Sequence, residues 1–304
     1  MRPSRSLSSL ASGWTFRKPF SIGSLRSIEQ SLAAAHRAHS HFTTEDKSAY
    51  PSGIKRHAAV LVSLCNVLDR SGNVLPSVLF TVRGSGLRTH SGEVSFPGGR
   101  VDEEDASFWG AATRETHEEL GILPSCVQRL GELCPPETAM RADTLVHAFV
   151  GFLHRDTNWD DSSSEDTILP PIDIQAARAH ISAEIADASA QHLPREVDQV
   201  FYLPLSVLIY DRRRRREGIF ERPWGRGRYW AIGVRDRISS VAPLGEMGEG
   251  VPLSSNVPQP DSEVGAGGGE PKTPEVWGLT GWYLNVFLRS AFPEHWDAKM
   301  GSRL

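Results

Sequence analysis

The chain has 304 residues, of which 39% are hydrophobic and 23% are charged. These values are ordinary for a soluble globular protein, and the length allows one sizeable hydrophobic core. The formal net charge of −4 gives no overall positive field, and no apolar run approaches the roughly 20 residues that span a bilayer, so we expect neither nucleic-acid binding nor a membrane span. Three cysteines, Cys65, Cys126 and Cys134, lack the spacing of a metal or redox site and are expected to be free thiols.

Both ends of the chain have the composition of targeting signals. Residues 1–28 contain no acidic residue but several arginines and many serines, which is typical of a mitochondrial transit peptide and also of a disordered tail. The chain ends in Ser302-Arg303-Leu304, a small–basic–leucine tripeptide that predicts recognition by a peroxisomal import receptor. We therefore expect the peroxisome as the location, with the mitochondrion as the alternative.

The hydrophobic pattern predicts helices and strands that follow one another along the chain. Residues 1–20 are expected to be disordered, and residues 22–38 to form a short amphipathic helix. Short β-branched runs predict buried strands at residues 58–62, 78–82, 146–153, 197–209 and 228–234. Further helices are expected at residues 106–120, 174–190 and 277–292.

This order of elements predicts one domain over residues 51–292, between a tail with a short helix at 1–50 and a C-terminal tail at 293–304. Two polar segments interrupt the domain. Residues 154–195 are rich in Ser and Asp and are interpreted as an insertion, and residues 236–274, rich in Gly, Pro, Ser and Glu, are predicted to be a disordered loop. Mixed strands with helices on both sides predict an α/β sandwich.

The most informative helix is the one predicted over residues 106–120. Asp102 and Asp105 are good helix N-cap residues, and Gly121 is a good C-terminal stop. Arg114 is placed to pair with Asp105 or Glu104, which would fix the helix against the loop that precedes it.

Three glutamates gather on one face of this helix. Glu115, Glu118 and Glu119 lie at positions i, i+3 and i+4, and their arc overlaps Phe108 and Ala112, which should face the core. Like charges at these spacings repel each other, and near a core they are costly unless a cation neutralises them. Carboxylate oxygens suit Mg²⁺ or Mn²⁺, and these cations in turn suit phosphate oxygens.

The alternative interpretation is a solvated acidic helix face, since glutamate is a good helix former. The residues around the helix favour the metal site. Gly98-Gly99 gives a turn whose backbone can approach a ligand or metal closely, and Arg114 directly precedes the first glutamate.

The same residues match a long motif of a glycine, an acid six positions later, a spacer, and Arg-Glu-apolar-x-Glu-Glu-x-Gly-apolar. They are Gly99, Asp105 and Arg114-Glu115-Thr116-His117-Glu118-Glu119-Leu120-Gly121-Ile122. This motif resembles the signature of the Nudix hydrolases. Thr116 stands at the apolar position, and the spacer from Asp105 to Arg114 is one residue longer than the general pattern. The longer spacer is usual in the coenzyme A pyrophosphatase branch.

A second motif lies immediately upstream. It comprises Leu79-Phe80-Thr81-Val82-Arg83-Gly84, Leu87, His90-Ser91-Gly92 and Phe96-Pro97-Gly98-Gly99. This stretch is similar to the second signature of the same branch, from which Phe80 and Gly84 depart.

Cationic donors in this upstream segment are candidate substrate ligands. Arg83 ends a predicted strand, and Arg88 and His90 lie in the loop that leads to the carboxylate helix, where they would face the phosphates of a metal-bound diphosphate. The alternatives are a surface charge for Arg83 and a loop-fixing hydrogen bond for His90.

The resemblance implies a Nudix-type α/β/α sandwich that hydrolyses the diphosphate of coenzyme A and acyl-CoA. The products would be 3′,5′-ADP and 4′-phosphopantetheine or its acyl form. Glu115, Glu118, Glu119 and the Gly99 carbonyl would hold Mg²⁺ or Mn²⁺. Arg114 would orient the first glutamate, and Glu118 or Glu119 would act as the base.

Other interpretations stay open at this point. The substrate could be NADH, ADP-ribose or another nucleoside diphosphate derivative, and the chain could be a non-catalytic nucleotide-binding module of the same fold. Glu196 could be an accessory acid or a surface glutamate. The arginine run 212–216 could attract a polyanionic substrate or form a solvated loop.

Overall fold

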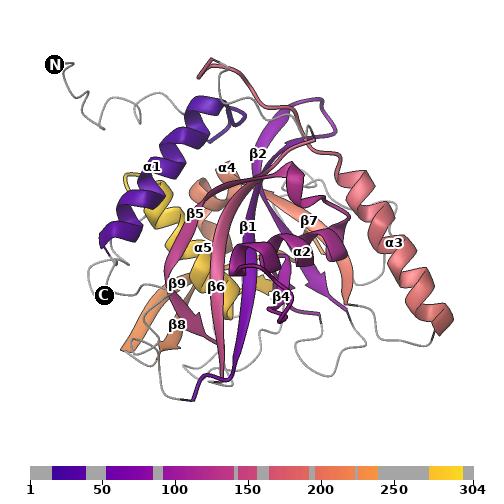
Figure 1. Cartoon of the computed structure of the whole chain (residues 1–304). Helices are drawn as coiled ribbons and strands as arrows, with labels where there is room; N and C mark the ends of the chain where they lie inside the picture. Colours follow the sequence, from indigo (N-terminus) through magenta and orange to yellow (C-terminus); the bar gives the residue numbers. More distant parts are fainter. Residues whose placement is uncertain are drawn as a thin grey trace.

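The computed structural model describes residues 16–38, 53–84, 92–139, 143–155, 164–191, 196–222, 225–238 and 274–296. A seven-stranded sheet lies at the centre of this part of the chain (Figure 1). Its strands are β1 (Arg56–Leu68), β2 (Val74–Arg83), β3 (Val94–Ser95), β4 (Gly98–Arg100), β5 (Val127–Thr138), β6 (Thr144–Leu153) and β7 (Val197–Pro204).

The sheet is mixed, as the sequence predicts. Its path is β3-β2-β1-β6-β5, with β4 paired to β1 and β7 paired to β2. Strand β1 runs parallel to β6 and antiparallel to β2 and β4. Strand β1 is central and buried on both faces, which explains its nearly continuous apolar sequence.

Helices cover both faces of the sheet and form two hydrophobic cores. On one face, α2 (Phe108–Leu120) and α3 (Ile174–Gln191) pack on alternate residues of β1 such as Leu61. On the other face, α1 (Ile22–Ala38) and α5 (Gly278–Ala291) pack with Val62. The predicted α/β/α sandwich is therefore confirmed.

The remaining elements extend the sandwich at one side. A second sheet, of order β10-β9-β8, packs beside α5. The elements are η3 (Pro124–Cys126), α4 (Leu205–Tyr210), η4 (Arg212–Arg214), β8 (Arg215–Arg222), β9 (Gly225–Gly233) and β10 (Glu275–Val276). None of the described helices is both long and apolar enough to cross a bilayer.

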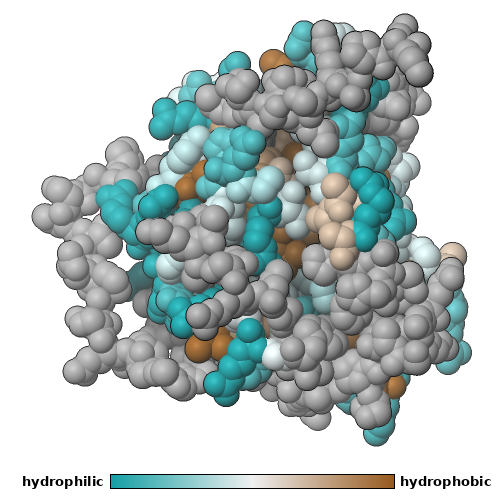
Figure 2. Space-filling model, turned by 90° about the vertical axis from the view of Figure 1, so that its left-hand side faces the viewer, coloured by the Kyte–Doolittle hydropathy of each residue, from teal (hydrophilic) through white to brown (hydrophobic). Residues whose placement is uncertain are grey.

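Helix α1 has the amphipathic character that its sequence predicts. Ile22, Leu25, Ile28 and Leu32 are buried, and their spacing of three or four residues places them on one stripe. On the side of the molecule that carries α1, the described residues show hydrophobic areas between hydrophilic ones (Figure 2).

Two predictions about the elements are wrong. Residues 16–20 belong to the core and not to a disordered tail, because Phe16 and Phe20 are buried. The strand predicted over residues 197–209 ends at Pro204, after which α4 follows. Proline has no N–H to donate to a strand ladder, so the apolar run continues as a short helix.

The predicted insertion, residues 154–195, contains the expected helix α3, which packs on α2 and β7. The predicted loop 236–274 lies mostly outside the described residues, as do residues 1–15 and the C-terminal tripeptide.

The buried position of Phe20 leads to a prediction about stability. Its ring contacts Phe152 edge to face at a centroid distance of 5.6 Å. We expect Phe20→Ala to lower the free energy of unfolding by about 3–5 kcal/mol, because it leaves a cavity in the core. Urea unfolding measures this change. Leu123→Ala, at a side chain that is half exposed, is the control and should have little effect.

Candidate active site

Helix α2 is fixed at both ends by local hydrogen bonds. The Ser107 side chain accepts a hydrogen bond from the Gly110 N–H, so Ser107 is the N-cap and the prediction of Asp102 or Asp105 is wrong. At the other end Gly121 adopts the left-handed conformation, with φ of 69°, and its N–H donates to the His117 carbonyl. The predicted stop at Gly121 is confirmed.

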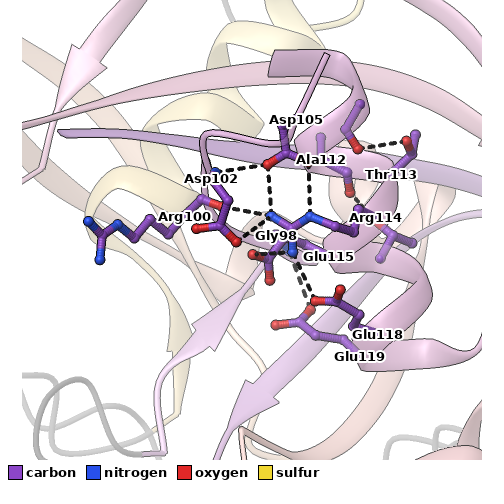
Figure 3. Close-up of polar contacts among 12 residues, drawn as sticks. Gly98, Arg100, Asp102, Asp105, Ala112, Thr113, Arg114, Glu115, Glu118 and Glu119 are labelled. Atoms are coloured by element: carbon purple, nitrogen blue, oxygen red, sulfur yellow. Dashed lines mark hydrogen bonds and ion pairs between the residues drawn. The ribbon is translucent and has the colours of Figure 1, made fainter. Parts of the chain in front are cut away.

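Arg114 ties the helix to the loop that follows β4 (Figure 3). Its Nε and Nη2 donate to the two carboxylate oxygens of Asp105, both at 2.9 Å, and Nη2 also donates to the Arg100 carbonyl at 3.0 Å. Its Nη1 donates to Glu115 at 3.1 Å and to Glu118 at 2.9 Å. The hydrogen bonds from Arg114 hold the pKa of Asp105 below its ordinary value. Of the two partners that the sequence predicts for Arg114, Asp105 and Glu104, Asp105 is the one that it binds.

The glycine turn of β4 lies directly against the carboxylate helix. Gly98 has a φ of 143°, and a Cβ there would overlap the Ala59 carbonyl oxygen, so glycine is required. A Cβ on Gly99 would lie 2.5 Å from a carboxylate oxygen of Glu115. The Gly98 N–H donates to Glu119 at 3.3 Å. At Gly98 the approach is to the backbone of β1 and requires glycine, whereas at Gly99 the nearest atoms are the carboxylate end of the Glu115 side chain.

The three glutamates differ in burial and in charge environment. Glu119 is buried, the Glu115 side chain is 13% exposed, and the Glu118 side chain is 52% exposed. Burial raises the pKa of Glu119 to about 8 and that of Glu115 to about 7, and Glu115 raises the pKa of Glu119 further by repulsion. The fold therefore holds two carboxylates whose ionised forms are costly without an added positive charge.

Two residues from the β2–β7 edge extend the site. Glu196 directly precedes β7, and its negative charge raises the pKa of both Glu115 and Glu119. Arg83 ends β2 and lowers the pKa of Glu119 by attraction. The Nε of Arg83 is buried and has no hydrogen-bond partner among the described residues. The site thus contains a fourth carboxylate and a cation with an unused donor.

Other candidate residues are placed differently. Arg88 and His90 lie in residues 85–91, outside the described part of the chain. Four members of the arginine run 212–216 have intramolecular partners. They are Arg213 with Asp211, Arg214 with Asp211 and Asp236, Arg215 with two backbone carbonyls and the Trp296 ring, and Arg216 with Glu275. Arg216 thus joins β8 to β10, and the other three arginines link η4 and β8 to neighbouring segments.

The residues present suit a hard divalent cation by their chemistry. Among the described residues, no three His, Cys, Asp or Glu side chains are already arranged as a ligand cluster. The Nη1 of Arg114 donates hydrogen bonds to oxygens of both Glu115 and Glu118. Carboxylate oxygens are nevertheless the donors that Mg²⁺ and Mn²⁺ prefer, and a cation would balance the charge on buried Glu119.

The raised pKa values predict how stability depends on pH. The folded-state pKa values, about 7 for Glu115 and about 8 for Glu119, exceed the ordinary value of 4.5, so the folded state binds more protons over that interval. We expect the free energy of unfolding, measured with urea and a chelator, to fall as the pH rises from about 5 to about 8. Glu119→Gln cannot titrate and should lose much of this slope. An unchanged slope in that variant would contradict the assignment.

Comparison with known proteins identifies the family. Residues 55–218 match the family model described as the NUDIX domain. The Nudix hydrolase NudL of Enterobacter sp. (strain 638), described as uncharacterized, is 39% identical over 111 residues, which are 36% of this chain and 54% of the relative. NudL of Escherichia coli O7:K1 (strain IAI39 / ExPEC) is 36% identical over 124 residues, which are 41% of this chain and 59% of the relative. The chain spans between a half and three fifths of the length of these curated relatives.

Two solved structures are similar over about half of the chain. The NUDIX domain of Shewanella oneidensis NrtR, complexed with ADP ribose, is similar over 58% of this chain and 84% of that one, with a TM-score of 0.29 and 15% identity. A C. elegans Ap4A hydrolase binary complex is similar over 52% of this chain and 87% of that one, with a TM-score of 0.30 and 17% identity. The family model covers more than half of the 304 residues, and on that match the chain belongs to the NUDIX domain family.

Proposed function

We propose that the chain is a metal-dependent hydrolase that cleaves the diphosphate of coenzyme A and acyl-CoA. The products are 3′,5′-ADP and 4′-phosphopantetheine or its acyl form. The observation that carries the proposal is the pair of poorly solvated carboxylates, Glu115 and Glu119, packed against the Gly98-Gly99 turn.

The family implies a divalent cation, and the donor set supports one. Glu115, Glu118 and Glu119, with the Gly99 carbonyl, would hold Mg²⁺ or Mn²⁺. When bound, such a cation offsets the negative charge of a diphosphate and lowers the pKa of a bound water.

The protein's own residues then position and activate the reactants. Arg114 orients Glu115 by a direct hydrogen bond and is itself anchored by Asp105. Glu118 or Glu119 accepts the proton of the attacking water, and the greater exposure of Glu118 supports its access to solvent. Arg83, which is partly exposed at the end of β2, holds a phosphate oxygen with its guanidinium.

The coenzyme A preference rests on the segment around Arg83. The motif at residues 79–99 resembles the signature of the coenzyme A branch, and the structure describes its first and last parts. NADH and ADP-ribose contain the same diphosphate linkage and are the competing substrates. A non-catalytic binding module is disfavoured because the three glutamates and Arg114 are all retained.

A substrate panel tests the proposed activity. Purified protein with Mg²⁺ or Mn²⁺ is incubated separately with CoA, an acyl-CoA, NADH and ADP-ribose, and the products are separated by chromatography. We expect metal-dependent formation of 3′,5′-ADP, with CoA or acyl-CoA giving the highest kcat/KM. Faster cleavage of NADH or ADP-ribose would overturn the substrate assignment, and binding without turnover would overturn the hydrolase assignment.

Substitution of the buried glutamates tests the site. We expect Glu119→Gln and Glu115→Gln each to lower turnover by about 100-fold or more while leaving the circular dichroism spectrum unchanged. The matched control is Glu104→Gln, because Glu104 is exposed and lies in the loop that precedes α2. If folded Glu119→Gln retained most of the wild-type rate, the carboxylate assignment would be wrong.

We also propose a peroxisomal location, which rests on the C-terminal tripeptide Ser302-Arg303-Leu304 and its reading by an import receptor. A fluorescent protein fused to the N-terminus should accumulate in peroxisomes, and deletion of the three residues should abolish this. Unchanged targeting after the deletion would exclude this signal. Accumulation in mitochondria of a protein with the fluorescent tag at its C-terminus would support a transit peptide at residues 1–28.

A further inference from the structure

Helix α3 contacts the catalytic helix at the end that carries Glu118 and Glu119. The two helices lie on the same face of the sheet, and α3 also packs on β7, the strand that follows Glu196 (Figure 1). This segment therefore bridges two elements that carry carboxylates of the site.

A buried stripe anchors α3 in this position. Ile174, Ala177 and Ile181 are buried in the same core cluster as Leu120 of α2 and Val200 of β7. Their spacing of three and four residues gives α3 a fixed rotation about its axis. His180 lies beside this stripe, so its ring is directed toward the last turn of α2.

The His180 ring binds the end of α2 in two ways. Its Nε2 lies 2.8 Å from the Glu118 carbonyl oxygen, which is one of the last carbonyls of the helix and has no amide partner in a continuing turn. Because a carbonyl oxygen can only accept, the Nε2–H of the ring donates this hydrogen bond. A Cβ on Gly121 would lie 3.0 Å from the ring, so the imidazole packs on the backbone of the C-cap.

We propose that His180 is a positioning residue that clamps the last turn of α2 and thereby sets the orientation of Glu118 and Glu119 for cation binding. Without the clamp, the last turn has one fewer capping hydrogen bond and frays more often. Fraying moves the two glutamate backbones relative to Glu115 one turn earlier. The cation-binding role of these glutamates rests on the proposed function, whereas the clamp itself does not.

The test measures Mn²⁺ affinity and local opening without relying on turnover. Electron paramagnetic resonance of free Mn²⁺ gives its dissociation constant, and hydrogen exchange gives the opening of the Leu120 and Gly121 amides. We expect His180→Ala to raise both the Mn²⁺ dissociation constant and the exchange rates by about two- to tenfold, the equivalent of one hydrogen bond. His180→Gln places an amide donor near the position of Nε2 and should restore most of both values.

The control is Glu184→Ala, four residues further along α3 at an exposed position, which should match the wild type in both measurements. The proposal is overturned if His180→Ala matches the wild type, or if His180→Gln is as impaired as His180→Ala. If His180→Ala changes the Mn²⁺ affinity as expected, but neither the wild type nor any variant hydrolyses a pyrophosphate compound, the clamp is supported and the proposed hydrolase activity is wrong.

Discussion

The bidentate pair between Arg114 and Asp105 is the interaction on which the candidate site depends. It joins the middle of α2 to the loop after β4, and its three further hydrogen bonds place Glu115, Glu118 and the Arg100 carbonyl around one guanidinium. The Asp105 side chain is 7% exposed and the Arg114 side chain is 29% exposed, so solvent reaches this pair mainly from the arginine side. Loss of the pair would free the helix from the glycine turn that it faces.

The geometry of that turn explains why ionisation of Glu115 and Glu119 is unfavourable in the absence of a cation. Packing against the Gly98-Gly99 turn buries Glu119 and Glu115, and this burial raises the pKa values of both carboxylates. The hydrogen bond from the Gly98 N–H acts in the opposite direction and lowers the pKa of Glu119. Arg83 offsets part of this charge, and Glu196 adds to it. A divalent cation would relieve the repulsion among these carboxylates, so the unfavourable charge of the site is what the proposed chemistry would use. The hydrolase activity, its coenzyme A preference and the location in the cell stay predictions.

The sequence predicts those features that depend on local rules. The end of α2 follows from Gly121, because glycine adopts the left-handed conformation at little cost. The boundaries of α1 follow from regular apolar spacing. The sequence also predicts Asp105 as one of two alternative partners of Arg114, and the structure contains this pair. The fold class follows from the alternation of apolar runs and amphipathic segments.

Features that depend on long-range contacts are not predictable in this way. Asp105 has the chemistry of an N-cap but binds Arg114, which leaves the cap to Ser107. Phe16 and Phe20 lie in a Ser- and Arg-rich stretch, and only distant partners such as Phe152 and Phe292 bury them. The contact of His180 with Glu118 joins residues 62 positions apart and has no sequence signal.

An anomalous difference map from crystals soaked in Mn²⁺ tests the proposed cation site most directly. We expect a strong peak about 2.1 Å from carboxylate oxygens of Glu115 and Glu119, as for a small hard cation. We also expect Glu118 to turn away from Arg114 toward the metal. Ordered Mn²⁺ elsewhere, with no peak at the three glutamates and with these still bound to Arg114 and Gly98, would show that they are not the cation ligands.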